Sequence, residues 1–248
     1  MRIRLVTALM AAAIPAAAIG QAVTPAITKA LADPSRPATD RARDNARHAG
    51  ELLAFAGIKP GDKVADFIMG GGYWTRILSG VVGPRGKVYA YQPAQFIQFR
   101  PAYGEEQKAA VAGRANTAAL NMGLGEVAFP EPLDAIVTVQ NYHDLHLSIV
   151  PPTFAGTIAK KLYGALKPGG TLLVVDHVSN PDPGFTSPQA LHRIDPAAAR
   201  KEIEAAGFVF EGESKLLRTD ADPRTASVFD ASIKGKTDQF VYKFRKPK

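Results

Sequence analysis

The side chains best suited to chemistry in this 248-residue chain gather in three short segments. His143 and Asp144 lie in "QNYHDLHL", Asp176 and His177 end "TLLVVDH", and His192 lies in "LHRID". Imidazole exchanges a proton near neutral pH, and a neighbouring carboxylate can orient it. Imidazole and carboxylate groups together also bind Zn, Mn or Fe. The three segments therefore indicate proton transfer or metal binding, provided that the fold brings them together.

Spacing alone does not fix a coordination sphere, so we predict a hydrogen-bonded polar cluster with no bound metal. A metal-dependent enzyme that uses His143, His177 and His192 remains an alternative. His and Asp in loops also cap helices or bind backbone amides without taking part in chemistry. Asp195, directly before Pro196, has the residue types of such a helix cap.

A second feature is the run of three glycines, Gly70, Gly71 and Gly72, in "VADFIMGGGYWTRIL". It follows an apolar stretch and precedes an amphipathic one, as a turn from a strand to a helix does. Glycine tolerates positive φ and lets backbone N–H groups approach a ligand closely. A helix N-terminus also favours a carboxylate or a phosphate. The run predicts a ligand-binding turn, with a purely structural tight turn as the alternative.

The elements that must position these groups follow from the alternation of short apolar runs with helical stretches. This alternation predicts an α/β fold with a mostly parallel sheet covered by helices on both faces. We expect strands at 63–68, 87–91, 117–122, 133–139, 171–176, 208–214 and 239–245, and helices at 73–79, 93–112, 153–166 and 196–206. A further helix is expected in the charged and apolar stretch before residue 57. Ligands of such sheets bind at the carboxyl ends of the strands, where both features above should meet.

From about residue 40 to residue 246, the chain resembles the class I S-adenosylmethionine-dependent methyltransferases. "VADFIMGGGYWT" is similar to their first motif, and "GKVYAYQP" to the strand whose end holds the cofactor ribose. "LDAIVTVQNYHDL" is similar to their fourth strand, and "ALKPGGTLLVVDH" to their fifth. The match looks closest to exported predicted methyltransferases of unassigned substrate. The resemblance implies a Rossmann-like sheet of seven strands with an antiparallel last strand, S-adenosylmethionine as cofactor and a small-molecule acceptor.

The resemblance also implies roles for individual residues. The expected cofactor-binding residues are Asp66, Gly70, Gly71 and Gly72 at the methionine end, Tyr91 and Gln92 at the adenosine, and Asn141 near the sulfonium. Methyl transfer needs an aligned nucleophile and removal of its proton. The loop after the fourth strand supplies the expected catalytic residues: His143 as general base, Asp144 beside it, and Tyr142, which could stack on the substrate.

Two positions depart from the family pattern. Ile68 stands where the first glycine of the motif is expected, and Gln92 stands where the ribose-binding acid is expected. A carboxylate accepts hydrogen bonds from both ribose hydroxyls, and charge-assisted hydrogen bonds are stronger than neutral ones. An amide still accepts through its oxygen and donates through its nitrogen. We therefore expect weakened cofactor binding.

The N-terminus is typical of export. Arg2 and Arg4 precede an apolar run that is too short to span a bilayer comfortably, as in a signal peptide. We predict a signal peptide at 1–22, a loose lead segment and helix at 23–50, and a single domain at 51–248. Cleavage would lower the net charge from +7 to +5, because residues 1–22 contain two Arg and no acid. The expected location is the periplasm or the exterior.

Export raises a question about the cofactor, which is made in the cytoplasm. A non-catalytic ligand-binding protein on the methyltransferase fold is therefore a further alternative. The chain has no cysteine, which excludes disulfides, thiolate metal sites and a Cys nucleophile. It shows no groove of basic and aromatic residues, so we expect no nucleic-acid partner and no membrane span after cleavage. The oligomeric state is left open by the sequence.

Overall fold

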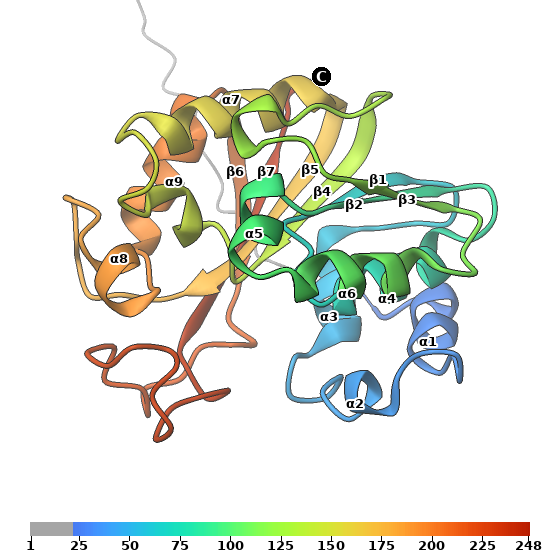
Figure 1. Cartoon of the computed structure of the whole chain (residues 1–248), viewed down its shortest axis with the longest axis horizontal. Coiled ribbons are helices and arrows are strands. Elements are labelled where there is room, and N and C mark those ends of the chain that lie inside the picture. Colours follow the sequence, from blue (N-terminus) through green and yellow to red (C-terminus); the bar gives the residue numbers. More distant parts are fainter. Residues whose placement is uncertain (1–21) are drawn as a thin grey trace, which may run out of the picture.

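The computed structural model describes residues 22–248, which are built around one sheet of seven strands (Figure 1). The strands are β1 Lys63–Phe67, β2 Lys87–Tyr91, β3 Thr117–Leu120, β4 Leu133–Val139, β5 Leu166–His177, β6 Val209–Ser214 and β7 Gln239–Arg245. Their order in the sheet is β3-β2-β1-β4-β5-β7-β6. Strands β1 to β5 pair in parallel, and β7 is antiparallel to both of its neighbours. The predicted Rossmann-like sheet with an antiparallel last strand is confirmed. The predicted signal peptide lies, except for its last residue, outside the described residues.

Helices cover both faces of the sheet. They are α1 Pro25–Leu31, α2 Ala38–Arg41, α3 Ala49–Ala56, α4 Tyr73–Val82, α5 Ala94–Phe99, α6 Ala102–Val111, α7 Phe154–Ala165, α8 Ser187–Leu191 and α9 Pro196–Ala205, with short 3₁₀ turns η1 Leu124–Glu126 and η2 His143–His146. Successive side chains of a strand point to opposite faces. Val64 thus packs with the apolar residues of α1, α3 and α4, while Ala65 and Phe67 pack with those of α7 and α9.

The lead segment is packed, contrary to the expectation of a loose one. Ile27 of α1 is fully buried against the domain. Gly80 of α4 lies so close to α1 that a Cβ on it would come within 2.7 Å of the Cβ of Ala30. The apolar face of α1 therefore docks on α4, and burial of this face holds the segment in place.

Two predicted helices are broken in the structure. The helix expected at 93–112 is divided into α5 and α6 around Pro101, which lacks the N–H that a continuous helix requires. The charged stretch before residue 57 forms α2 and α3 with turns between them, and His48 there has a φ of 46°. Asp40 and Asp44 of this stretch bind side chains of α4 instead of supporting one long helix.

Figure 1 shows that the N-terminal helices, in blue, and the loop at 215–238, in red, lie at the same end of the molecule. This end contains the cavities described below. Within residues 22–248, none of the helices has the length and apolar content that crossing a membrane requires.

Candidate functional site

The glycine turn, residues 68–72, connects β1 to α4 at the carboxyl edge of the parallel strands. Gly70 and Gly72 adopt positive φ of 54° and 79°. The turn is tied to both neighbouring strands. Gly70 donates its N–H to Oε1 of Gln92 beyond β2 at 3.0 Å, and the Asn141 amide beyond β4 donates to the carbonyl of Ile68 at 2.8 Å. The ends of three strands therefore fix its shape.

Ile68 has a φ of 61°, which a β-branched residue rarely adopts. The structure thus keeps the left-handed backbone that glycine favours, although the residue is isoleucine. The side chain of Ile68 is 1% exposed and packs in the apolar core with Phe67 and Tyr142. Such strain persists only where the surroundings fix the conformation. The departure at Ile68 therefore costs backbone energy but leaves the turn in place.

Asp66, near the end of β1, lies beneath the turn and is 2% exposed. One of its carboxylate oxygens accepts a hydrogen bond from the hydroxyl of Thr75 at 2.6 Å. Burial outweighs this hydrogen bond and raises the pKa of Asp66 to about 6. The carboxyl group thus binds α4 and can change its protonation state near neutral pH.

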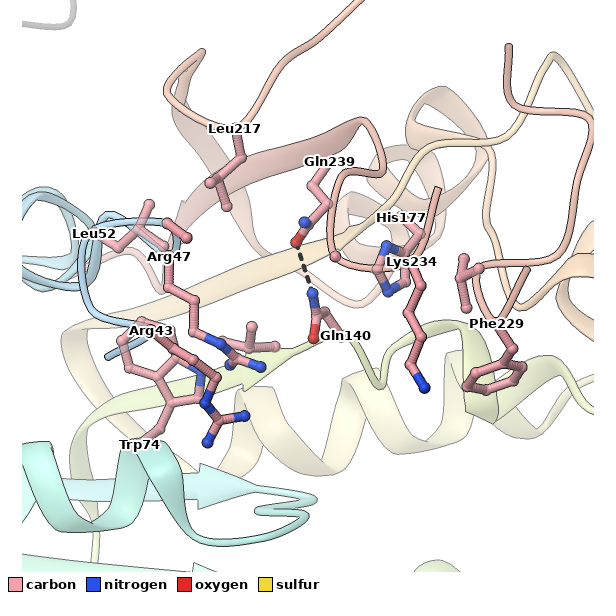
Figure 2. Close-up of a pocket in the computed structure, with 14 residues that line it drawn as sticks. Arg43, Arg47, Leu52, Trp74, Gln140, His177, Leu217, Phe229, Lys234 and Gln239 are labelled. Carbon is pink, nitrogen blue, oxygen red and sulfur yellow. Dashed lines mark hydrogen bonds between the residues drawn. The ribbon is translucent and has the colours of Figure 1, made fainter. Parts of the chain in front are cut away.

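Two adjoining cavities occupy this end of the sheet. The smaller one, of about 170 Å³, lies at the glycine turn; the larger one, of about 420 Å³, extends from it towards the loop at 215–238. Five residues line both cavities: Arg43, Arg47, Trp74, Val139 and Gln140. Figure 2 shows the larger cavity, with Arg43 and Arg47 on one side, Lys234 on the other and Gln140 between them.

The predicted cofactor-binding residues divide into two groups. Four of them line the smaller cavity: Asp66, Gly70, Gly71 and Asn141. Gly72 faces α6 instead, where a Cβ would come within 2.4 Å of the Cβ of Ala110. Tyr91 is fully buried on the other face of the sheet, and its hydroxyl contacts the carbonyls of Met122 and Gly123 at 3.3 Å.

Gln92 is also fully buried beside the glycine turn. Its Oε1 accepts a hydrogen bond from the N–H of Gly70, and its Nε2 has no hydrogen-bond partner among the described residues. A buried polar atom without a partner costs about 1–3 kcal/mol, which makes it a natural contact for a ligand. The amide thus leaves one donor free where the family pattern has an acid.

His143 forms an ion pair in the interior. Its Nδ1 lies 2.8 Å from Oδ1 of Asp176, and its backbone N–H donates to the other oxygen of the same carboxylate at 2.8 Å. Burial opposes a charge on the ring, but the attraction and hydrogen bond of Asp176 outweigh it and raise the pKa of His143 to about 9. At neutral pH the ring is therefore a cation with its counter-ion beside it.

The other face of His143 meets Asp144 and His192. Its Nε2 lies 3.3 Å from Nδ1 of His192 and 3.3 Å from Oδ1 of Asp144, and the latter two atoms are 3.9 Å apart. His192 holds this position with a φ of 52°, again in the left-handed region. We call these three residues the histidine cluster; it is the one group among residues 22–248 whose ligand atoms are close enough to share a metal ion.

His177 lies outside the histidine cluster. The alternative that grouped His143, His177 and His192 therefore has Asp144 in the place of His177. Nδ1 of His177 is 2.7 Å from the hydroxyl of Thr237, and its ring lines the larger cavity. Burial lowers the pKa of His177 to about 4, so this ring is neutral at pH 7.

Tyr142 contacts neither cavity. Its ring is fully buried in the core, and its hydroxyl donates to Glu202 of α9 at 2.6 Å. Its side chain points into the core that packs against α7 and α9. The structure thus separates Tyr142 from the residues that line the cavities.

Sequence reasoning missed the basic residues of the site, Arg43 and Arg47. They reach the cavities because the turn segment before α3 is anchored to α4: Asp40 pairs with Arg76 at 2.6 Å, and Asp44 accepts from the hydroxyl of Tyr73 at 2.6 Å. The guanidinium of Arg47 lies over the ring of Tyr73, 4.6 Å from its centre. The feature of the sequence that could have indicated these residues is the spacing of two arginines four residues apart.

Of the comparisons with known proteins, only the one with solved structures identifies the fold. No family model matches the chain, and no curated protein matches its sequence. Among solved structures, a SAM-dependent methyltransferase from Aquifex aeolicus is similar at 22% identity with a TM-score of 0.56, over 89% of this chain and 96% of that one. An N-methyltransferase from Bradyrhizobium japonicum is similar at 12% identity with a TM-score of 0.57, over 84% of this chain and 97% of that one.

A third similar structure is that of a possible exported protein from Bordetella parapertussis, at 17% identity with a TM-score of 0.52. The match covers 84% of this chain and 68% of that one. Identities this low establish architecture and leave chemistry open. The chain therefore has the fold of the class I S-adenosylmethionine-dependent methyltransferases.

Proposed function

We propose that this protein transfers a methyl group from S-adenosylmethionine to a small-molecule acceptor. The observation that carries the proposal is the pair of adjoining cavities at the carboxyl edge of a methyltransferase-like sheet. The smaller cavity follows the glycine turn, where this fold binds its cofactor, and the larger one adjoins it with room for an acceptor.

The residues of the smaller cavity suit the methionine end of S-adenosylmethionine. The space beside Gly70 is open, since a Cβ there would meet no described atom within 4 Å. The Arg43 guanidinium, which lines this cavity, would bind the methionine carboxylate. Gln92 lines neither cavity, so its Nε2, unpaired among the described residues, would donate to a ribose oxygen only after the residues that cover it move. When bound, this cofactor supplies an electrophilic methyl group on a sulfonium ion. The chain's own task is to orient both molecules and to accept a proton from the acceptor.

His177 is better suited than His143 to accept that proton. It is neutral at pH 7 and lines the larger cavity, whereas His143 is already protonated and lies behind it. The charged His143 has a positioning role in this proposal. It holds the Asp176 carboxylate, which in turn accepts the backbone N–H of His177 at 2.8 Å. Asp144 sits on the far side of His143 and would share in that role.

Calorimetric titration of the purified protein with S-adenosylmethionine and with S-adenosylhomocysteine tests the proposal. Saturable binding of both is expected, with a weakened affinity because an amide replaces the ribose-binding acid. An absence of binding at millimolar ligand would refute the proposal. Saturable binding with no transfer of a labelled methyl group to any fraction of a cell extract would favour the non-catalytic alternative.

A second candidate function, metal-dependent catalysis, is favoured by the geometry of the histidine cluster. A point equidistant from the three ligand atoms lies about 2.0 Å from each, given their separations of 3.3, 3.3 and 3.9 Å. This matches metal bonds to imidazole and carboxylate of about 2.0–2.2 Å. Asp176 would orient His143 as an outer carboxylate, as in many metal sites.

Elemental analysis after gentle purification, followed by thermal unfolding with added Zn, Mn or Fe, tests this candidate. Bound metal that is lost in His192→Ala would support it. A metal-free protein whose thermal stability is unchanged by all three ions would exclude it.

We also propose export, on the predicted signal peptide at 1–22. The similarity to a possible exported protein is in line with this. Cell fractionation and N-terminal sequencing of the mature chain test the proposal; an intact Met1 in a cytoplasmic fraction would contradict it.

A further inference from the structure

The larger cavity is lined by cations and hydrogen-bond donors. Three basic side chains line it, Arg43 and Arg47 from the turn segment before α3 and Lys234 from the loop at 215–238. Among the described residues that line this cavity, none is an acid. Figure 2 shows these side chains approaching the same space from opposite sides. The cavity thus has a strongly positive lining contributed by two distant parts of the sequence.

Two of the three cations form no ion pair within the described part of the chain, although Asp40 and Asp44 lie near enough to Arg47 to attract it. Arg43 is paired with Asp40 at 2.8 Å, but neither Arg47 nor Lys234 forms an ion pair or a side-chain hydrogen bond there. Burial and the neighbouring Arg43 lower the pKa of Arg47, because both disfavour its charge. An anion bound in the cavity would offset both the burial of the Arg47 charge and its repulsion by Arg43.

Trp74 provides an independent indication of the same kind. Its ring lines the cavity and is 5% exposed, and its indole N–H has no hydrogen-bond partner among the described residues. A buried N–H without an acceptor is unfavourable. An oxygen of a bound ligand would satisfy this donor.

The remaining wall of the cavity is apolar. It is formed by side chains from the core that packs against α3 and α4 and from the loop at 215–238: Leu52, Val139, Leu217, Val228 and Phe229. An inorganic ion would leave this surface uncovered, whereas an organic ligand would cover it. A volume of about 420 Å³ lies within the range of sites for small organic molecules.

We propose that the larger cavity binds an organic anion, with a carboxylate or phosphate group between Arg47 and Lys234 and an apolar ring or chain against Leu217 and Phe229. This inference rests on the proposed function, because it makes that anion the methyl acceptor. The neutral ring of His177 lies in the same cavity, where it would meet the group to be methylated.

Fluorescence titration tests the inference directly, since Trp74 is the only tryptophan of the chain. Three probes that do not absorb with tryptophan are suitable: cyclohexanecarboxylate, its neutral methyl ester and cyclohexyl phosphate. At constant ionic strength, we expect at least one anion to bind about tenfold more tightly than the ester, and its binding to weaken as salt is added. The two anions distinguish a carboxylate site from a phosphate site.

Charge-neutralising variants locate the binding. Lys234→Gln alters an exposed side chain that lines only the larger cavity, so it should fold normally and bind the anion about tenfold less tightly. Arg47→Gln should have the same effect, with circular dichroism to verify its fold. Arg85→Gln removes an equal charge from the opposite edge of the sheet and should change the affinity less than twofold.

Equal binding of the ester and both anions, or an unchanged affinity in Lys234→Gln, would overturn the inference. Calorimetry with S-adenosylhomocysteine keeps it separate from the proposed function. Anion binding without cofactor binding would refute methyl transfer but leave the anion site. Cofactor binding with no preference for an anion would refute the anion site but leave the proposal of methyl transfer.

Discussion

Replacing Asp66 by Asn should make the protein more stable at neutral pH. Asp66 is fully buried, and its pKa is raised from 3.8 to about 6 in the folded state. A raised pKa means that the folded state binds the proton more tightly than the unfolded state. The stabilisation from this group is therefore complete below pH 3.8 and is lost as the pH rises through about 6. The shift corresponds to about 3 kcal/mol.

Asn can still accept the hydrogen bond from Thr75, and it carries no charge at any pH. Urea unfolding of both proteins at pH 4.5 and 7.5 measures the effect. The stability of Asp66→Asn relative to the native protein should rise by about 2 kcal/mol between these values, because part of the transition lies below pH 4.5. Asp220→Asn, at an exposed carboxylate, controls for the loss of an acid. A difference that stays constant with pH, or that falls, would refute the reasoning.

Three further predictions concern the site and its frame. Gln92→Glu places a carboxylate where the amide nitrogen has no partner among the described residues, so calorimetry should show about tenfold tighter cofactor binding. Urea unfolding should show a lower stability, because the new charge is buried. An unchanged cofactor affinity would contradict this prediction. His177→Asn should reduce methyl transfer about 10²-fold or more with cofactor affinity unchanged, and equal losses of both would indicate a structural role. Asp222→Ala removes the ion-pair partner of the fully buried Arg193 and should lower the free energy of unfolding in urea by about 3–5 kcal/mol. Glu211→Ala, at a partly exposed ion pair, should lower it by about 1 kcal/mol or less. Equal losses in the two variants would contradict this prediction.

The sheet and the glycine turn could be predicted because both depend on local pattern. Apolar runs bounded by turn residues identify strands, and a run of glycines after a strand identifies a close backbone approach. It was harder to predict which side of the sheet each residue faces. Tyr91 and Gln92 are neighbours in sequence but face opposite ways, and only Gln92 lies at the glycine turn. One residue of register decides such a question, and the turns at strand ends obscure it.

The basic lining of the cavities could not be predicted, because it depends on contacts between distant residues. Arg43 and Arg47 face the site because Asp40, close to them in sequence, pairs with Arg76, which lies 36 positions after Asp40. The different protonation states of His143 and His177 depend likewise on which ring contacts Asp176. Helical periodicity gives no information on either pairing, whereas burial and counter-ions set the protonation states.

Cofactor binding by Gly71→Val tests the central claim most directly. Gly71 has no positive φ, and a Cβ there would be 3.7 Å from the nearest side-chain atom, so the fold should accept valine. A valine side chain there would add bulk at the wall of the smaller cavity, which Gly71 lines. We expect calorimetry with S-adenosylhomocysteine to show saturable binding to the native protein and at least tenfold weaker binding to a stably folded Gly71→Val. Equal affinity of the two proteins, or no binding to either, would contradict the assignment of this turn as the cofactor site.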